Sequence, residues 1–194
     1  MTATRQRIID ASAELMRLQG YAATGVKEIV TAARAPFGSL YHFFPGGKEQ
    51  LGAEAVRHSG AEYGKLLPAV LGADPDPERA VRTFFDLAAA HLVETGYEDA
   101  CPIATVALEE SSRSEMIRQA CADVFGDWID EGSAILRRHG VPDPHARRLV
   151  IEMLAGLEGA FVLCRATRST EALQVVGDAS VRAVQAWRGA TSSP

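Results

Sequence analysis

The 194-residue sequence has no apolar run long enough to cross a membrane, and it has only three cysteines. A spanning helix needs about 20 mostly apolar residues, whereas the most apolar stretch, Met153 to Cys164, is shorter and contains Glu158. The first 20 residues mix Arg and Asp with apolar residues, so we expect no signal peptide. The odd, widely spaced cysteines favour a reducing compartment over a disulfide framework. We therefore expect a cytoplasmic protein with no membrane partner.

The sequence also lacks the short motifs of common enzyme and metal sites. None of the five histidines forms a His-Glu-x-x-His motif or follows a glutamate by three positions. Gly46-Gly47-Lys48 is like part of a phosphate-binding loop, but His42 and Glu49 stand where that loop requires Gly and Ser or Thr. Neither Gly-x-Ser-x-Gly nor Gly-x-Gly-x-x-Gly occurs. We predict no catalytic residues, no metal and no cofactor, and hence no enzyme.

The sustained alternation of apolar and polar residues that strands need is absent as well. We predict an all-α protein of about nine helices, three of them before residue 45. Gly20 should stop the first helix, Thr24 should cap the second, and Pro68 should kink or end the fourth. Later helices should be capped by Asp76 before Pro77, by Ser114, by Asp143 before Pro144, and by Ser169 or Thr170, and a short helix should begin at Pro102.

Two short helical patterns joined by a tight turn lie between Thr24 and Phe44, which is the layout of a helix-turn-helix. The string Gly-Ser-Leu-Tyr-His-Phe-Phe-Pro at 38–45, followed by Lys48-Glu49, resembles the signature of the TetR family of bacterial repressors. The resemblance implies a DNA-binding domain at 1–47, with its helix-turn-helix at about 25–44. It also implies a ligand-binding and dimerisation domain at 48–194, and double-stranded operator DNA as a partner.

The distribution of charge agrees with this division. The net charge is −5, but residues 1–50 carry six Lys or Arg against four Asp or Glu, and the remainder carries fourteen against twenty-one. A mildly basic head on an acidic body is typical of a DNA-binding domain joined to a domain with another task.

The signature residues divide into two kinds of predicted DNA contact. Tyr41 and His42 cannot both face the core if Leu40 and Phe44 do, and both side chains can reach phosphate oxygens. The family resemblance implies that they contact phosphates, and a solvated aromatic pair at a helix end is the alternative. Lys48, at a helix start, should also attract a phosphate. Phe37, Gly38 and Ser39 are the residues expected to face bases. The full candidate DNA-binding set is Thr24, Arg34, Phe37, Gly38, Ser39, Tyr41, His42 and Lys48.

Two positions depart from the family pattern. Phe37 stands where relatives often have Lys or Arg, and a phenyl ring cannot make a bidentate contact to guanine. Arg34 stands where the turn often has Gly, so either the turn differs or Arg is tolerated because its side chain reaches DNA. An alternative function therefore stays open: a helical protein that binds or sequesters a ligand and has weak or lost operator binding.

The segment Cys101–Glu109, together with residues 45–51, resembles the LmrA/YxaF-like subgroup of the family. This resemblance implies that the body binds a small hydrophobic or amphipathic effector between helices. Ordinary core packing is the alternative role for each candidate. The candidate pocket residues are Phe84, Phe85, His91, Cys101, Leu108, Cys121, Phe125, Trp128 and Phe161.

The last two predicted helices are rich in small and apolar residues, which let helices approach closely. Two such helices from each of two subunits would form a four-helix interface, and a reader of two-fold operators needs a homodimer. Packing within one chain is the alternative. The candidate interface residues are Met153, Gly156, Gly159, Ala160, Leu163, Val176 and Val184.

Overall fold

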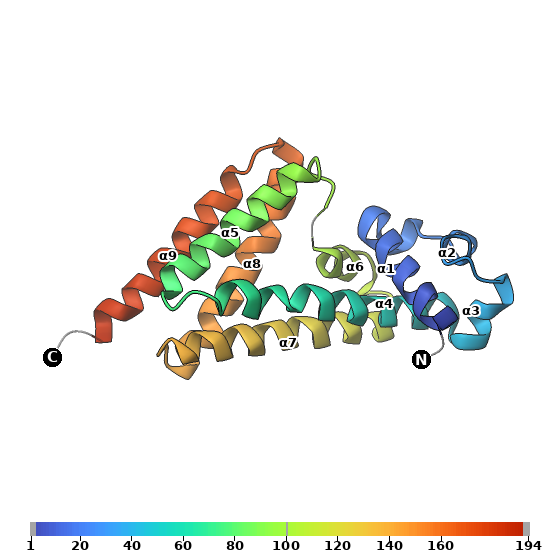
Figure 1. The fold of residues 1–194 in the computed structure, drawn as a ribbon, viewed down its shortest axis with the longest axis horizontal. Helices are drawn as coiled ribbons and strands as arrows, with labels where there is room; N and C mark the ends of the chain where they lie inside the picture. Colours follow the sequence, from blue (N-terminus) through green and yellow to red (C-terminus); the bar gives the residue numbers. More distant parts are fainter. Residues whose placement is uncertain (1–2, 100, 192–194) are drawn as a thin grey trace. The chain divides into compact units, whose positions relative to one another are not determined.

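The computed structural model describes residues 3–99 and 101–191, and this part of the chain is all-α (Figure 1). It contains nine α-helices, one short π-helical segment and no strand, which confirms the predicted fold class. None of these helices is long and apolar enough to cross a membrane. The helices are α1 (Ala3–Ala23), α2 (Val26–Ala32), α3 (Phe37–Phe43), α4 (Gly47–Gly64), α5 (Pro77–Glu94), α6 (Pro102–Glu110), α7 (Glu115–Arg138), α8 (Asp143–Thr167) and α9 (Glu171–Thr191).

The helices pack into two compact units. Unit 1 comprises the described residues of Met1–Tyr63 and Cys101–Gly126, and unit 2 those of Gly64–Ala100 and Asp127–Pro194. The predicted domain boundary after residue 47 falls at the start of α4, and almost all of α4 packs within unit 1. The functional division into 1–47 and 48–194 stays a prediction.

In unit 1, helices α1, α2 and α3 and the start of α4 enclose a small core. Leu40 and Phe44 are fully buried, and Phe43 packs against the same cluster. The two phenylalanines therefore serve the core, since a domain of this size relies on large apolar side chains. The other buried members of this core are Ile8, Ile9, Ile29, Val30, Ala33 and Leu51.

Helix α1 is interrupted at Gly20, as the sequence predicts, and the interruption changes the role of Thr24. Gly20 has φ 81° and ψ 172°, a conformation that favours glycine. The Thr24 hydroxyl donates to the Gly20 carbonyl at 2.7 Å, and Gly25, not Thr24, is the N-cap of α2. The predicted cap at Thr24 is wrong because the break in α1 leaves a carbonyl that this hydroxyl satisfies.

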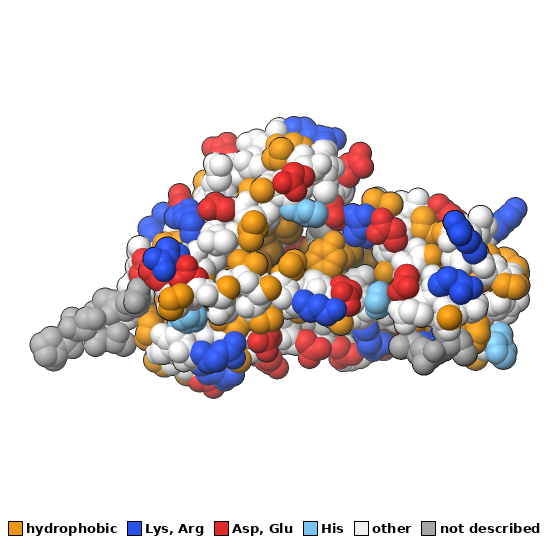
Figure 2. Space-filling view, in the orientation of Figure 1, with side chains coloured by type: hydrophobic (Ala, Val, Ile, Leu, Met, Phe, Trp, Pro, Cys, Tyr) orange, Lys and Arg blue, Asp and Glu red, His pale blue; other side chains and the backbone are white. Residues whose placement is uncertain are grey.

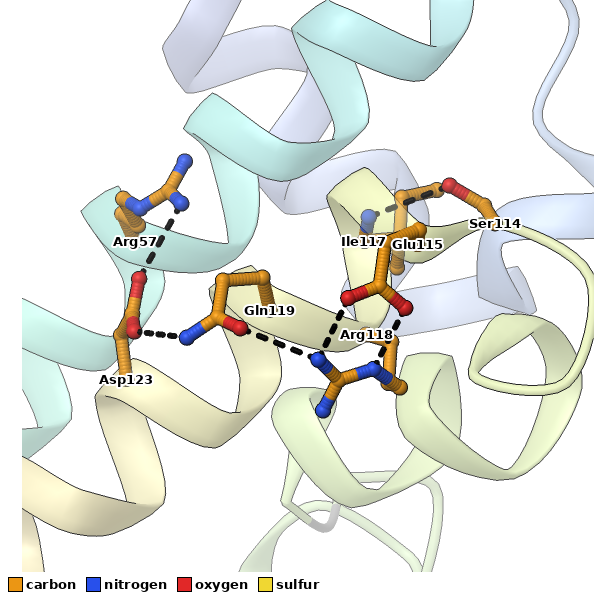
Figure 3. Close-up of polar contacts among 7 residues, drawn as sticks. All are labelled: Arg57, Ser114, Glu115, Ile117, Arg118, Gln119 and Asp123. Atoms are coloured by element: carbon orange, nitrogen blue, oxygen red, sulfur yellow. Dashed lines mark hydrogen bonds and ion pairs between the residues drawn. The ribbon is translucent and has the colours of Figure 1, made fainter.

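The other caps are formed as predicted with one exception. Ser114 Oγ accepts from the Ile117 amide at 3.1 Å at the start of α7 (Figure 3), and Asp76 accepts from the Glu78 amide at 3.1 Å before α5. The Ser169 hydroxyl accepts from the Glu171 amide at 3.2 Å. The predicted cap at Asp143 is wrong: Pro142 is the N-cap, and the Asp143 carboxylate instead accepts from Arg137 at 2.7 Å.

Polar side chains link α4 to α7 within unit 1. Arg57 of α4 donates to Asp123 at 3.1 Å, and Gln119 donates to the same carboxylate at 2.7 Å (Figure 3). Arg118 continues this chain to Gln119 and Glu115. Helix α4, which begins beside the helix-turn-helix, is thereby joined to a second helix of unit 1.

In unit 2, α5, α8 and α9 lie side by side around one core (Figure 1). Leu92, Cys164 and Val184 are fully buried in it. Pro68 lies in the π-helical segment Leu67–Leu71, so the helix that begins at Gly47 ends before this proline, as predicted.

Candidate nucleic-acid interface

The turn between α2 and α3 is a Schellman motif, in which the residue after the C-cap adopts a left-handed conformation. Arg34 has φ 50°, its amide donates to Thr31 O at 3.1 Å, and the Ala35 amide donates to Val30 O at 2.9 Å. Ala35 then packs against the core of unit 1, as the residue after the left-handed position usually does. The turn is therefore the ordinary one, with arginine at a position that favours glycine.

Replacing Arg34 with glycine should raise the free energy of unfolding by about 0.5–1 kcal/mol, because a left-handed conformation is strained for a residue with a Cβ. Denaturant unfolding of the full chain would measure this. Arg34→Ala is the matched control, since it removes the guanidinium and keeps the strain. If glycine gives no gain over alanine, Arg34 is not strained. Weaker DNA binding in both variants would assign the guanidinium a contact with DNA.

Helix α3 exposes two aromatic rings on one face. Phe37 is 54% exposed and Tyr41 is 52% exposed, and their ring centroids are 6.1 Å apart. His42 is exposed beside them, whereas Ser39 is half-buried. The structure thus places five of the predicted contact residues, Gly38 included, along one short helix, whose buried residue is Leu40.

Gly38 has no structural reason within unit 1 to be glycine. It lies in α3 without a positive φ, and a Cβ built on it would meet no atom within 4 Å. Glycine destabilises a helix interior by up to about 1 kcal/mol relative to alanine. A glycine here leaves room for something outside the chain to come close to the backbone.

The charge around α3 suits a polyanion. No Asp or Glu occurs from Ile29 to Lys48, while Arg34 and Lys48 are cationic. In Figure 2 the side chains visible over α2 and α3 are mainly hydrophobic, Lys or Arg. A duplex presents closely spaced phosphates, which such a surface attracts without like-charge repulsion.

Lys48 lies in the first turn of α4, but its ammonium group contacts other residues of unit 1. The nitrogen is 4.2 Å from the centroid of the Tyr21 ring. Burial lowers the pKa of Lys48, an effect that Glu110 and Glu109 of α6 oppose. A phosphate contact would therefore compete with a cation–π contact and two nearby carboxylates.

Thr24 does not join this surface. It is fully buried, and its hydroxyl is already bonded to Gly20 O. Its hydroxyl is therefore not available to a phosphate in this structure.

Three residues that support the helix-turn-helix were not predicted from the sequence. Arg7 donates to Ala33 O at 3.0 Å and so holds the end of α2. Glu109 of α6 accepts from the Ala22 amide at 3.0 Å, next to the break in α1, and Tyr21 contacts Lys48. These partners are 26, 87 and 27 positions apart, so no local pattern in the sequence indicates them.

The predicted pocket residues are divided between the two units. Cys101 and Cys121 are buried in unit 1, where burial raises the pKa of the Cys121 thiol to about 11, and Leu108 is 81% exposed. In unit 2, Phe85 is buried against the backbone of Gly177 and belongs to the core. The ligand pocket stays a prediction. The remaining members are Phe125 in unit 1, half-buried, and Phe84, Trp128, Phe161 and the more exposed His91 in unit 2.

The predicted interface residues are divided between a buried face and an exposed face, and the interface stays a prediction. Met153, Ala160 and Val184 are buried in the core of their own chain, and a Cβ on Gly156 would come within 2.6 Å of Val176 of the same chain. These residues join α8 to α9 within one subunit. Gly159 and Leu163 are exposed instead. The sequence could not separate the faces because α8 is apolar around most of its circumference.

Comparison with known proteins identifies the class first. A family model described as bacterial regulatory proteins, tetR family, matches residues 8–55, which include α2 and α3. The helix-turn-helix is thus that of a DNA-binding transcriptional regulator. A second model, described as the C-terminal domain of LmrA/YxaF-like transcriptional regulators, matches residues 77–179. The chain belongs to the TetR family, with a body of the LmrA/YxaF type, and the prediction that it is not an enzyme is confirmed by this membership.

Individual relatives are similar in sequence to this chain over about nine tenths of its length. It is 31% identical to the HTH-type transcriptional regulator YxaF of Bacillus subtilis, covering 90% of this chain and 92% of that one. It is also 31% identical to LmrA of the same species, covering 88% and 90%. The fold is similar to that of E. coli NemR in its reduced form, with a TM-score of 0.81 at 21% identity over 92% of this chain and 95% of that one.

Proposed function

We propose that this regulator is a repressor that binds operator DNA as a homodimer and is released by a small amphipathic ligand. Its place of action is the cytoplasm, where bacterial operators lie. The α3 surface carries the DNA-binding part of the proposal: Phe37 and Tyr41 are exposed beside Gly38, in a segment without carboxylates. Each α3 enters a major groove, and the two half-sites lie about 34–36 Å apart or at a multiple of that distance.

Selection of bound duplexes from a random pool tests this proposal directly. The expected result is a palindromic operator whose affinity falls steeply with salt, because cationic side chains displace counterions from phosphates. A protein that only sequesters a ligand is the alternative function. It would enrich no sequence from the pool and show no salt-sensitive binding to duplex DNA.

Substitutions at Tyr41 and Lys48 separate neutral from charged phosphate contacts. Tyr41→Phe should weaken binding to the operator and to random DNA by the same factor and leave the salt slope unchanged, since a hydroxyl displaces no counterion. Lys48→Ala should also weaken both, and it should reduce the slope by about 0.9. Titrations at four or more salt concentrations measure both quantities. An unchanged slope for Lys48→Ala would mean that the ammonium group stays with Tyr21 and the α6 carboxylates when DNA binds.

An exposed stripe of small and apolar residues supports the homodimer. Its members on α8 are spaced by three or four positions and its members on α9 by four and seven, spacings that place residues on one helix face. Two copies of such a pair of helices would form an isologous four-helix interface. The stripe consists of Ile151, Ala155, Gly159, Val162 and Ala166 on α8 and of Val175, Ala179 and Ala186 on α9.

The LmrA/YxaF-type body supports the ligand-responsive part of the proposal. A ligand can release DNA only if it binds more tightly to a conformer whose two α3 helices are wrongly spaced for the operator. Amphipathic compounds would be screened by thermal shift of the free protein and then by release from the selected operator. A compound that stabilises the protein without releasing DNA would argue against this coupling.

A further inference from the structure

The exposed phenyl ring of Phe37 is the most unusual feature of the α3 surface. Phe37 is 54% exposed, and Tyr41, one turn later on the same face, holds its ring centroid at 6.1 Å. A neighbouring ring one turn away restricts the rotamers of an exposed side chain and contributes a few tenths of a kcal/mol to the helix. The ring is therefore presented in a defined position, although it fills no space in the core of its own unit.

The charge and shape around Phe37 indicate what can cover this ring. The segment Ile29–Lys48 holds no carboxylate, and the position of a Cβ on Gly38 is open. A polyanion can thus approach α3 closely without repulsion. This step rests on the proposed function, in which the occupant is the major groove of duplex DNA.

The composition of α3 then restricts what it can read in that groove. Guanine is read by Arg or Lys and adenine by Asn or Gln, and none of these residues occurs in Phe37–Phe43. The one major-groove feature that suits an apolar ring is the C5 methyl group of thymine. We propose that Phe37 is a specificity-determining residue that selects thymine by packing its ring on this methyl group, once in each half-site.

Replacement of thymine by deoxyuridine tests the proposal because it removes only the methyl group. Each thymine of the selected operator would be replaced in turn, in one half-site and then in both, and the affinity of wild type and of Phe37→Ala measured at one salt concentration. In wild type, one position per half-site should lose about four-fold in affinity, and the double replacement about fifteen-fold, as expected for one buried methyl-sized group in each. In Phe37→Ala the same replacements should have no effect.

A gain-of-preference variant provides a second readout. Phe37→Lys should select guanine in place of thymine at that position, because an ammonium group binds guanine O6 and N7. Phe37 is exposed, so both variants should unfold at nearly the wild-type temperature, which circular dichroism checks. The same position should keep thymine in selections with Ser39→Ala, which alters a neighbouring candidate base contact.

The outcomes separate this inference from the proposed function. If no deoxyuridine position weakens wild type, or if the losses are equal in Phe37→Ala, the methyl contact is overturned while salt-dependent operator binding stands. Unchanged base preference in Phe37→Lys overturns it as well. If no duplex is enriched at all, it is the proposed function that fails.

Discussion

Replacing Gly38 with alanine should weaken operator binding by about 5- to 150-fold while leaving the fold at least as stable. A Cβ at this position meets no atom of the chain within 4 Å, so alanine introduces no clash in the free protein. Alanine is also preferred over glycine in helices by up to about 1 kcal/mol. In the complex, the added methyl group lies where the groove must approach the backbone, and overpacking of this kind costs about 1–3 kcal/mol.

Two measurements on one preparation test this prediction: the temperature of thermal unfolding, and the affinity for the selected operator from a binding titration. Gly126→Ala is the matched control, because Gly126 also lies in a helix with no atom within 4 Å of its Cβ position and is not in α3. The control should gain stability and bind DNA normally. If Gly38→Ala binds as well as the control, α3 does not approach DNA at Gly38, and the recognition surface must be sought elsewhere on unit 1.

Gly38→Ala is expected to keep or raise stability and to weaken DNA binding, so the reason for glycine at this position lies in binding and not in the fold. A glycine with a positive φ, such as Gly20 or Gly47, is explained by the backbone that it allows. Gly38 has neither a strained backbone nor a close neighbour. A helix prefers most other residues to glycine at such a position. Residues that go against a local structural preference are found most often at functional sites.

Local signals in the sequence were sufficient for the helices and for the recognition segment. Helix α1 is interrupted at Gly20 and α4 ends before Pro68, as expected, and Ser114 caps α7. The two wrong caps have a common cause. Thr24 and Asp143 carry suitable side chains, but each bonds another group, Gly20 O in one case and the Arg137 guanidinium in the other. A capping residue is recognisable from sequence, whereas the competition for its oxygen is decided by the folded chain.

Contacts between distant segments could not be predicted. Glu109 and Ala22 are 87 positions apart, and neither stands in a motif that would connect them. The exposed face of α8 could not be identified from the sequence either, because a helix with apolar residues on most sides has no single apolar stripe that marks its buried face. The packing of Gly156 against Val176 and the burial of Met153 and Ala160 show which side of α8 faces α9.

Substitutions at Gly156 and Gly159 of α8 test the proposed dimer, because the first faces α9 of the same subunit and the second is exposed. Gly156 and Gly159 are three residues apart, yet a Cβ on Gly156 would meet Val176 Cγ1 at 2.6 Å and one on Gly159 would meet nothing within 4 Å. Gly156→Leu should therefore separate α8 from α9 and destabilise the fold by about 1–3 kcal/mol. Gly159→Leu should leave the subunit folded, since its side chain points into open space.

At the exposed stripe, the added leucine of Gly159→Leu should instead disturb the packing between subunits. An overpacking penalty of about 1–3 kcal/mol corresponds to a dimer weakened by about 5- to 150-fold. Operator affinity should then depend steeply on protein concentration, because a single subunit can hold only one half-site. Sedimentation at micromolar concentration would measure the dimer, with Gly126→Leu as a control for the same change on α7. If Gly159→Leu forms as tight a dimer as wild type, the interface does not include this face of α8, and the exposed side of α9 around Val175 and Ala179 becomes the region to examine.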